Sequence, residues 1–245
     1  MKIVAINSSP KGPKSNTCIM VEAFLDGVKK AGADAEQIFL SKHEIKPCLG
    51  CFSCWFVTPG KCVIKDDMSQ LLDKIEGADV IVFATPLYFD NISGMMKNFM
   101  DRTVSRADPR LRQDENGESV HASLSNKKSA DIVVMSNCGF PEQSQFQVLH
   151  LLFQRVARNC QSKVLAEIYR SQGPLLSVDS PLLRPLIAKY KKLLQHAGEE
   201  IVRDGKLSSK TEEKLSRPIV PCAQYIKTAN QRIEAKLAEL KQNRE

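Results

Sequence analysis

Four cysteines, Cys48, Cys51, Cys54 and Cys62, lie within one 15-residue segment, which reads CLGCFSCWFVTPGKC. Two residues separate Cys48 from Cys51 and Cys51 from Cys54, and seven separate Cys54 from Cys62, so a single turn of backbone can direct several sulfur atoms to one centre. Thiolates at this spacing are typical of an iron-sulfur cluster or of a tetrahedral zinc ion. The segment therefore predicts a metal site. It leaves open which metal is bound, or whether the thiols stay free and reduced.

Residues 7–17 (NSSPKGPKSNT) connect the first predicted strand to the first predicted helix. Free backbone N–H groups at the start of a helix, several hydroxyls and two lysines favour a bound phosphate, and the helix dipole adds to the attraction. The loop is neither a G-x-G-x-x-G fingerprint nor a Walker loop, which disfavours a Rossmann dinucleotide site. The alternative is a helix cap of Ser, Asn and Thr residues without a ligand.

Two further loops follow predicted strands and could enclose a flat ring. Residues 85–94 (TPLYFDNISG) combine a rigid proline with aromatic and small turn residues. Tyr88 can stack on an aromatic cofactor while exposed N–H groups meet the heteroatoms of the ring. Residues 136–141 (SNCGFP) could close over the same ring. The alternative for Tyr88 is an aromatic side chain that merely covers the end of the sheet.

Apolar runs alternate with amphipathic stretches through the chain, which indicates β and α elements in turn. The predicted strands are residues 2–6, 35–40, 79–84, 130–135 and 163–168, and the predicted helices are 17–31, 68–76, 94–102 and 142–158. Near-continuous apolar strands in such an alternation form a parallel sheet with helices on both faces. We therefore expect an α/β, doubly wound, five-stranded sheet of flavodoxin-like order. Its ligands gather at the carboxyl ends of the strands.

The chain divides into a flavodoxin-like region, residues 1–170, and a helical extension, residues 171–245. Within the first, the polar segment 105–128 is expected to be a lid or disordered. In the extension, Ile226, Ala229, Ile233, Leu237 and Leu240 recur at a spacing of three and four residues. This apolar seam is expected to pack on its own domain or to pair with another subunit.

Composition limits the classes of function. The chain has no basic-then-apolar signal segment and no apolar run of membrane-spanning length, so we expect a cytoplasmic protein without a membrane partner. A reducing cytosol makes its eight cysteines a poor disulfide framework. The net charge of +7 is concentrated after Pro181, where basic residues alternate with acidic ones and lack interleaved aromatics. This pattern indicates a solvated helix surface and no nucleic-acid site.

Together, the three loops and the cysteine segment resemble those of the flavodoxin-like NADPH-dependent FMN reductases, and within that family the iron-sulfur flavoproteins. The resemblance covers about the first 170 residues. It implies that the first loop holds the phosphate of FMN, that the second holds the isoalloxazine and that the third meets its far edge. The implied cofactor residues are, loop by loop, Ser9, Lys11, Ser15, Asn16 and Thr17; Pro86, Leu87, Tyr88 and Asn91; Cys138 and Gly139. The cysteines Cys48, Cys51, Cys54 and Cys62 would hold a [4Fe–4S] cluster.

This resemblance implies an FMN-dependent oxidoreductase that moves electrons from NAD(P)H or a ferredoxin-like donor to a small acceptor. The flavin carries the chemistry, so no catalytic side chain is expected, and the four histidines are scattered. A cluster in the loop after the second strand would lie at the flavin edge and face a neighbouring subunit's FMN, in a homodimer or homotetramer. The alternatives are an electron carrier without its own small substrate and a zinc-stapled binding module.

Overall fold

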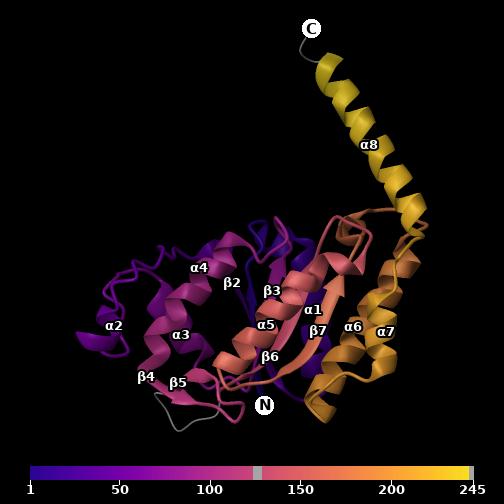
Figure 1. Cartoon of the computed structure of the whole chain (residues 1–245). Coiled ribbons are helices and arrows are strands. Elements are labelled where there is room, and N and C mark those ends of the chain that lie inside the picture. Colours follow the sequence, from indigo (N-terminus) through magenta and orange to yellow (C-terminus); the bar gives the residue numbers. More distant parts are fainter. Residues whose placement is uncertain (124–128, 243–245) are drawn as a thin grey trace.

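A parallel sheet of five strands forms the centre of the protein (Figure 1). The computed structural model describes residues 1–123 and 129–242. The strands lie in the order β2-β1-β3-β6-β7, and every neighbouring pair is parallel. Their bounds are Lys2–Asn7 (β1), Asp34–Phe39 (β2), Val80–Pro86 (β3), Asp131–Asn137 (β6) and Val164–Arg170 (β7). The predicted flavodoxin-like α/β fold is therefore confirmed.

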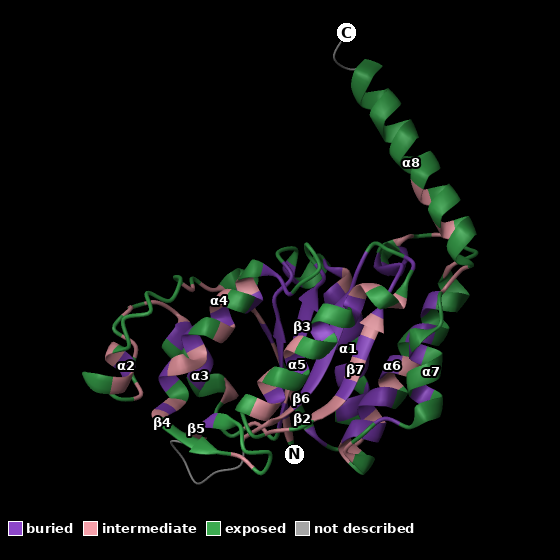
Figure 2. Cartoon of the chain, viewed as in Figure 1, coloured by how far each residue is buried: buried purple, intermediate pink, exposed green. Residues whose placement is uncertain are grey.

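Helices cover both faces of this sheet, and each face has its own apolar core. Alternate residues along β1 separate the cores, since Ile3 and Ala5 lie in one and Val4 and Ile6 in the other. The first core contains α1 (Asn16–Lys30), α6 (Arg184–Asp204) and α7 (Ser209–Ser216); the second contains α3 (Met68–Ile75), α4 (Gly94–Arg102) and α5 (Gln147–Asn159). Figure 2 shows the buried interior between these layers.

Helices α1 and α6 pack closely because each carries a glycine at the contact. A Cβ atom on Gly27 would lie 1.8 Å from the Gln195 carbonyl oxygen, and one on Gly198 would lie 2.2 Å from the Phe24 carbonyl oxygen. No side chain larger than hydrogen fits at either position without moving backbone. The predicted helical extension therefore contributes α6 to the core of the flavodoxin-like region.

The segment 105–128 differs from its prediction. It forms an antiparallel hairpin of β4 (Ala107–Gln113) and β5 (Ser119–Ser123), and its last residues, 124–128, lie outside the described residues. Arg158 of α5 pairs with Asp114 at 2.7 Å, which ties the hairpin to α5. The described part is therefore a hairpin beside α5, and the His121 ring contacts that of Trp55 in the cysteine segment at 5.2 Å between ring centres, away from the three loops (Figure 1).

The last helix, α8 (Cys222–Gln242), leaves the body of the protein (Figures 1 and 2). None of its residues is buried, and Ile226, Ile233, Leu237 and Leu240 of the apolar seam are all exposed. Its first turns are attached through the Tyr225 hydroxyl, which donates to the Gly139 carbonyl oxygen at 2.6 Å, and through the Cys222 thiol, which lies 3.8 Å from the Pro141 carbonyl oxygen. The seam therefore does not pack on its own domain, and pairing with a second subunit stays a prediction. Residues 243–245 of the extension lie outside the described residues.

Among residues 1–123 and 129–242, no helix combines the length and the apolar character needed to cross a membrane.

Candidate functional site

Three loops meet at the carboxyl edge of the sheet and form a hollow of about 160 Å³. They follow β1, β3 and β6, the strands at the centre of the sheet, where the chain order reverses. The hollow brings together ten of the eleven residues predicted from sequence to bind the cofactor. Its lining consists of Ser9, Lys11, Ser15, Asn16, Thr17, Pro86, Leu87, Tyr88, Asn137, Cys138, Gly139 and Pro174.

One end of the hollow is the N-terminus of α1. The Ser15 side chain caps this helix, since its hydroxyl oxygen accepts from the Cys18 N–H at 3.0 Å and its proton goes to the Gly12 carbonyl at 2.7 Å. The next two N–H groups, those of Asn16 and Thr17, have no partner among the described residues. With the Lys11 ammonium nearby, these free N–H groups form a site for an anion.

Residues 87–91 form a tight turn at the second wall of the hollow. Tyr88 and Asn91 exchange two backbone hydrogen bonds of 3.0 and 3.1 Å. The residues between them, Phe89 and Asp90, have φ values of 48° and 59°, the left-handed region of a type I′ turn. Such a conformation costs roughly 1 kcal/mol or more for a residue like phenylalanine. Backbone strain of this kind concentrates at ligand sites.

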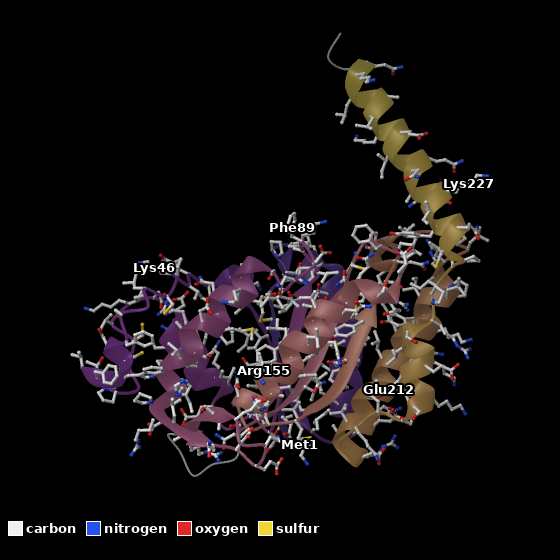
Figure 3. The ribbon with its side chains drawn as sticks, in the orientation of Figure 1. Met1, Lys46, Phe89, Arg155, Glu212 and Lys227 are labelled. Atoms are coloured by element: carbon white, nitrogen blue, oxygen red, sulfur yellow. The ribbon has the colours of Figure 1, made fainter. Side chains whose placement is uncertain are left out.

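The strained turn presents two aromatic rings to solvent. Phe89 is fully exposed, and Figure 3 shows it at the outer surface. Tyr88 is 48% exposed and lines the hollow. A flat ligand in the hollow can therefore cover Tyr88 and remain open to a second molecule on its outer side.

The first two loops are joined to each other. Ser93 caps α4 by accepting from the Met96 N–H, and its own hydroxyl is 2.8 Å from the Ser8 hydroxyl. The Ser93 backbone N–H donates to the Thr85 hydroxyl at 2.9 Å. These buried bonds fix the anion site relative to the turn that carries Tyr88.

Backbone hydrogen bonds to the end of β7 and to the residues after it fix the position of the third loop. The Cys138 N–H donates to the Arg170 carbonyl, and the Gly173 N–H donates to the Cys138 carbonyl at 2.8 Å. A Cβ atom on Gly173 would lie 2.8 Å from Asn137 Oδ1, so only glycine allows this close approach. Burial raises the pKa of the Cys138 thiol to about 11, so it is neutral at physiological pH and offers an apolar surface.

Sequence reasoning missed Asn137 and Pro174 and included one residue outside the hollow. Asn137 lies one residue before Cys138, and its Nδ2 donates to the Thr17 hydroxyl at 2.9 Å, which links the third loop to the first. The position of Asn137 at the end of a buried strand could have indicated that it lines the ligand site. Asn91 does not line the hollow, because its side chain accepts from the Ile92 N–H within the turn.

The four cysteines line a second, smaller hollow of about 30 Å³. Cys54 is the second residue of the short helix α2 (Ser53–Phe56) and is buried, while Cys48 and Cys51 are exposed. Burial raises the pKa of Cys54, as do the neighbouring thiols of Cys62, Cys48 and Cys51, which therefore lie within electrostatic range of it. A hydrogen bond from Ser53 lowers the pKa of Cys51. The structure thus brings all four predicted sulfur ligands to one place.

The geometry of this hollow bears on which metal it suits. Among the described residues, no group of three or more His, Cys, Asp or Glu side chains is close enough to hold a single metal ion. A tetrahedral zinc ion with Zn–S bonds of about 2.3 Å requires its four sulfurs to lie within ~4 Å of each other. A cluster holds its ligands farther apart, because each cysteine binds a different iron atom.

The two hollows lie at opposite ends of α4. Ser93, which caps the helix start, is joined to the first loop, and Arg102, at the helix end, lines the cysteine hollow. Nine residues of helix span ~13 Å. The hollows share no lining residue. Within one chain the two hollows are therefore separate, and a position of the cysteines at the FMN edge of a neighbouring subunit stays a prediction.

Solved structures with the same fold include an azoreductase and a quinone oxidoreductase. An FMN-dependent NADH-azoreductase from Bacillus anthracis, solved with FMN, superposes with a TM-score of 0.56 at 17% identity, over 82% of this chain and 98% of that one. An NAD(P)H:quinone oxidoreductase from Methanothermobacter marburgensis superposes with a TM-score of 0.58 at 14% identity, over 83% of this chain and 98% of that one. At these identities the likeness establishes the fold alone.

Sequence identity is higher to curated proteins named iron-sulfur flavoprotein than to these solved structures. One from Archaeoglobus fulgidus is 46% identical over 103 residues, which are 42% of this chain and 49% of that protein. Another, from Methanocaldococcus jannaschii, is 38% identical over 103 residues, 42% of this chain and 52% of that protein. The chain thus spans about half the length of the curated relatives it matches. Residues 1–151 match the family described as NADPH-dependent FMN reductase. The chain therefore belongs to the NADPH-dependent FMN reductase family.

Proposed function

We propose that the protein is an FMN-dependent oxidoreductase, which moves electrons from NAD(P)H or a ferredoxin-like donor to a small acceptor. The observation that carries this proposal is the hollow itself, where an anion site and an aromatic side chain line one cavity. Family membership supports the same function. The names of the curated relatives and of the enzymes that share the fold agree with it.

The residues present fit FMN. The free N–H groups of Asn16 and Thr17 and the Lys11 ammonium suit a phosphate dianion. The half-exposed Tyr88 ring suits a planar ligand, and the turn that carries it leaves the N–H groups of Phe89 and Asp90 without a described partner. Because two backbone hydrogen bonds between Tyr88 and Asn91 close the turn, it holds these donors in a fixed direction.

FMN supplies hydride and single-electron transfer when it is bound. The role of the chain is to bind and orient FMN. The N-terminus of α1 and Lys11 hold the phosphate, Tyr88 packs on the ring, and Cys138 and Gly139 border the far edge of the ring. The neutral Cys138 thiol keeps this border apolar. We assign no catalytic acid or base. The exposed side of the ring site, beside Phe89, is where a donor or acceptor would approach.

Anaerobic steady-state kinetics test the proposed activity. Protein loaded with FMN should oxidise NAD(P)H in the presence of a quinone, azo or nitro acceptor, with a turnover on the order of 10 s⁻¹. An electron carrier without its own small substrate would bind FMN equally well and show negligible turnover with any of these acceptors. Turnover only after a reduced ferredoxin is added would identify the ferredoxin-like donor.

Replacing Tyr88 by alanine should weaken FMN binding about tenfold, because a stacking surface worth 0.5–1.5 kcal/mol beyond its area is lost. Fluorescence titration of the flavin-free protein with FMN measures this change. Phe89→Ala is the control, since Phe89 is fully exposed and does not line the hollow. Equal affinities for the Tyr88→Ala variant and the wild type would remove Tyr88 from the site.

We propose that Cys48, Cys51, Cys54 and Cys62 hold a [4Fe–4S] cluster. Anaerobically prepared protein should then contain iron and sulfide, and Cys51→Ser should lose most of both, because serine oxygen is a poor cluster ligand. Cys160→Ser, outside this hollow, should keep them. Iron and sulfide analysis of the wild type, Cys51→Ser and Cys160→Ser tests the cluster proposal. Equal, negligible contents in all of them would contradict the cluster and leave the FMN site unaffected.

We further propose that the protein is a homodimer or homotetramer in which the α8 seam pairs between subunits. A 21-residue helix with no buried residue gains its stability from packing elsewhere. Ile233→Glu, in the middle of the seam, should lower the mass measured by light scattering by at least one subunit. Gln231→Glu, on the same helix outside the seam, should not. An unchanged mass for both variants would exclude α8 from the interface. The cytoplasmic location stays a prediction.

A further inference from the structure

The cysteine hollow contains one positively charged side chain, Arg102, and that side chain is buried. Only 1% of the Arg102 side chain and none of the Asp66 side chain is exposed. A buried guanidinium is expensive to desolvate and needs partners for its N–H groups. Asp66 is its one carboxylate partner among the described residues.

Asp66 holds the guanidinium in a fixed orientation. Arg102 Nη1 donates to Asp66 Oδ2 at 2.6 Å and Nη2 donates to Oδ1 at 3.1 Å, which is a bidentate pair. Nη1 also donates to the Lys46 carbonyl at 2.7 Å, and the Lys46 N–H donates to Asp66 Oδ2 at 2.9 Å. Lys46 and Asp66 flank the cysteine segment on its two sides. The ion pair therefore fixes both ends of the segment.

This arrangement leaves the Arg102 Nε–H without a partner. Nε is buried and forms no hydrogen bond within the described chain. An unsatisfied buried donor costs about 1–3 kcal/mol, and more on a charged group. The Asp66 hydrogen bond raises the pKa of Arg102 most, and Cys62 contributes as well, which places that sulfur within range of the guanidinium. The unpartnered donor belongs to a side chain that lines the sulfur site.

We propose that the Nε–H of Arg102 donates a hydrogen bond to a sulfur atom of the group that the four cysteines hold, and that this contact makes the group easier to reduce. The inference rests on the proposed function, in which that group is an iron-sulfur cluster. Four thiolates make the cluster site anionic, and an added electron, supplied by the flavin or by an external reductant, makes it more so. A buried positive charge and a hydrogen bond to sulfur both stabilise the reduced form. Asp66 acts through Arg102 and is a positioning residue.

Reductive titration tests the effect on potential. The double variant Arg102→Gln/Asp66→Asn removes both charges together and so avoids leaving a buried carboxylate unpaired. Relative to wild type, the cluster should favour its reduced form about tenfold less, which corresponds to a potential ~59 mV lower for one electron. Arg106→Gln/Asp73→Asn, which removes an exposed ion pair outside the hollow, should leave the potential unchanged. Equal cluster potentials in the first double variant and in wild type would overturn the inference.

A second measurement needs no variant and therefore does not depend on whether one folds. In wild type labelled with ¹⁵N-arginine and reduced with dithionite, pulsed electron paramagnetic resonance should show a hyperfine coupling from the cluster to one arginine nitrogen. A reduced cluster without any such coupling would overturn the inference, even if the cluster itself is present. Wild type without iron would overturn it as well, whereas FMN titration of the same sample tests the flavin site separately.

Discussion

Asn16→Asp should weaken FMN binding by about 100-fold, or ~2.7 kcal/mol, and leave riboflavin binding unchanged. Asn16 is the first residue of α1, and its N–H is one of the two free donors at the anion end of the hollow. The substitution conserves size and adds one negative charge. Two charges about 4 Å apart near a protein surface interact by roughly 4 kcal/mol, so the added charge opposes a phosphate strongly. Riboflavin lacks the phosphate and is not opposed.

The same substitution should stabilise the flavin-free protein. A carboxylate in the first turn of a helix interacts favourably with the helix dipole by about 0.3–1 kcal/mol. The expected outcome is therefore a higher melting temperature without flavin together with a lower affinity for FMN, which general damage to the fold cannot produce. Asn16→Ser, which is neutral and a good residue for a helix start, is the control. Equal FMN affinities for the Asp and Ser variants would show that the phosphate binds elsewhere.

Gly27→Ala should lower the free energy of unfolding by about 3 kcal/mol. Its added Cβ atom would lie 1.8 Å from the Gln195 carbonyl oxygen, so α1 and α6 must separate. Separation also removes contacts of Phe24 and Leu194, which pack in the core at this interface. The loss exceeds the ~1 kcal/mol that alanine gains over glycine within a helix. Denaturant unfolding of the flavin-free protein measures the change.

Gly94→Ala is the matched control for this prediction. Gly94 begins α4, has an ordinary helical conformation, and its added Cβ atom would contact nothing within 4 Å. Alanine there should be neutral or slightly stabilising. If Gly27→Ala were as stable as Gly94→Ala, the close approach of α1 and α6 would be contradicted, and with it the assignment of α6 to the sheet face.

The sheet and its helices were predictable because the signals are local. Residues 80–84 and 132–135 are apolar without interruption, as expected of strands buried on both faces, and amphipathic helices alternate with the strands. Once a parallel sheet is inferred, the loops that follow its strands must meet at one edge. For this reason the three loops could be placed at one edge, and the resemblance to the FMN reductases then implied ten of the residues that line the first hollow, although no contact between them could be predicted.

Features that depend on contacts between distant segments were not predictable. Arg102 at the end of a helix has the sequence signature of an ordinary exposed cap, and only tertiary packing buries it against Asp66. The αL turn at Phe89 and Asp90 lacks the glycine that usually marks a type I′ turn. By contrast, Asn116 and Gly117 are a common hairpin signal, and they could have indicated the β4–β5 hairpin.

Calorimetric titration of the flavin-free protein tests the central claim, that the loops after β1, β3 and β6 together bind FMN by its phosphate and its ring. The account predicts saturable heat with one FMN per chain, and much weaker binding of riboflavin, because the α1 terminus then has no anion to bind. Equal affinities for FMN and riboflavin, or no heat with either, would contradict it.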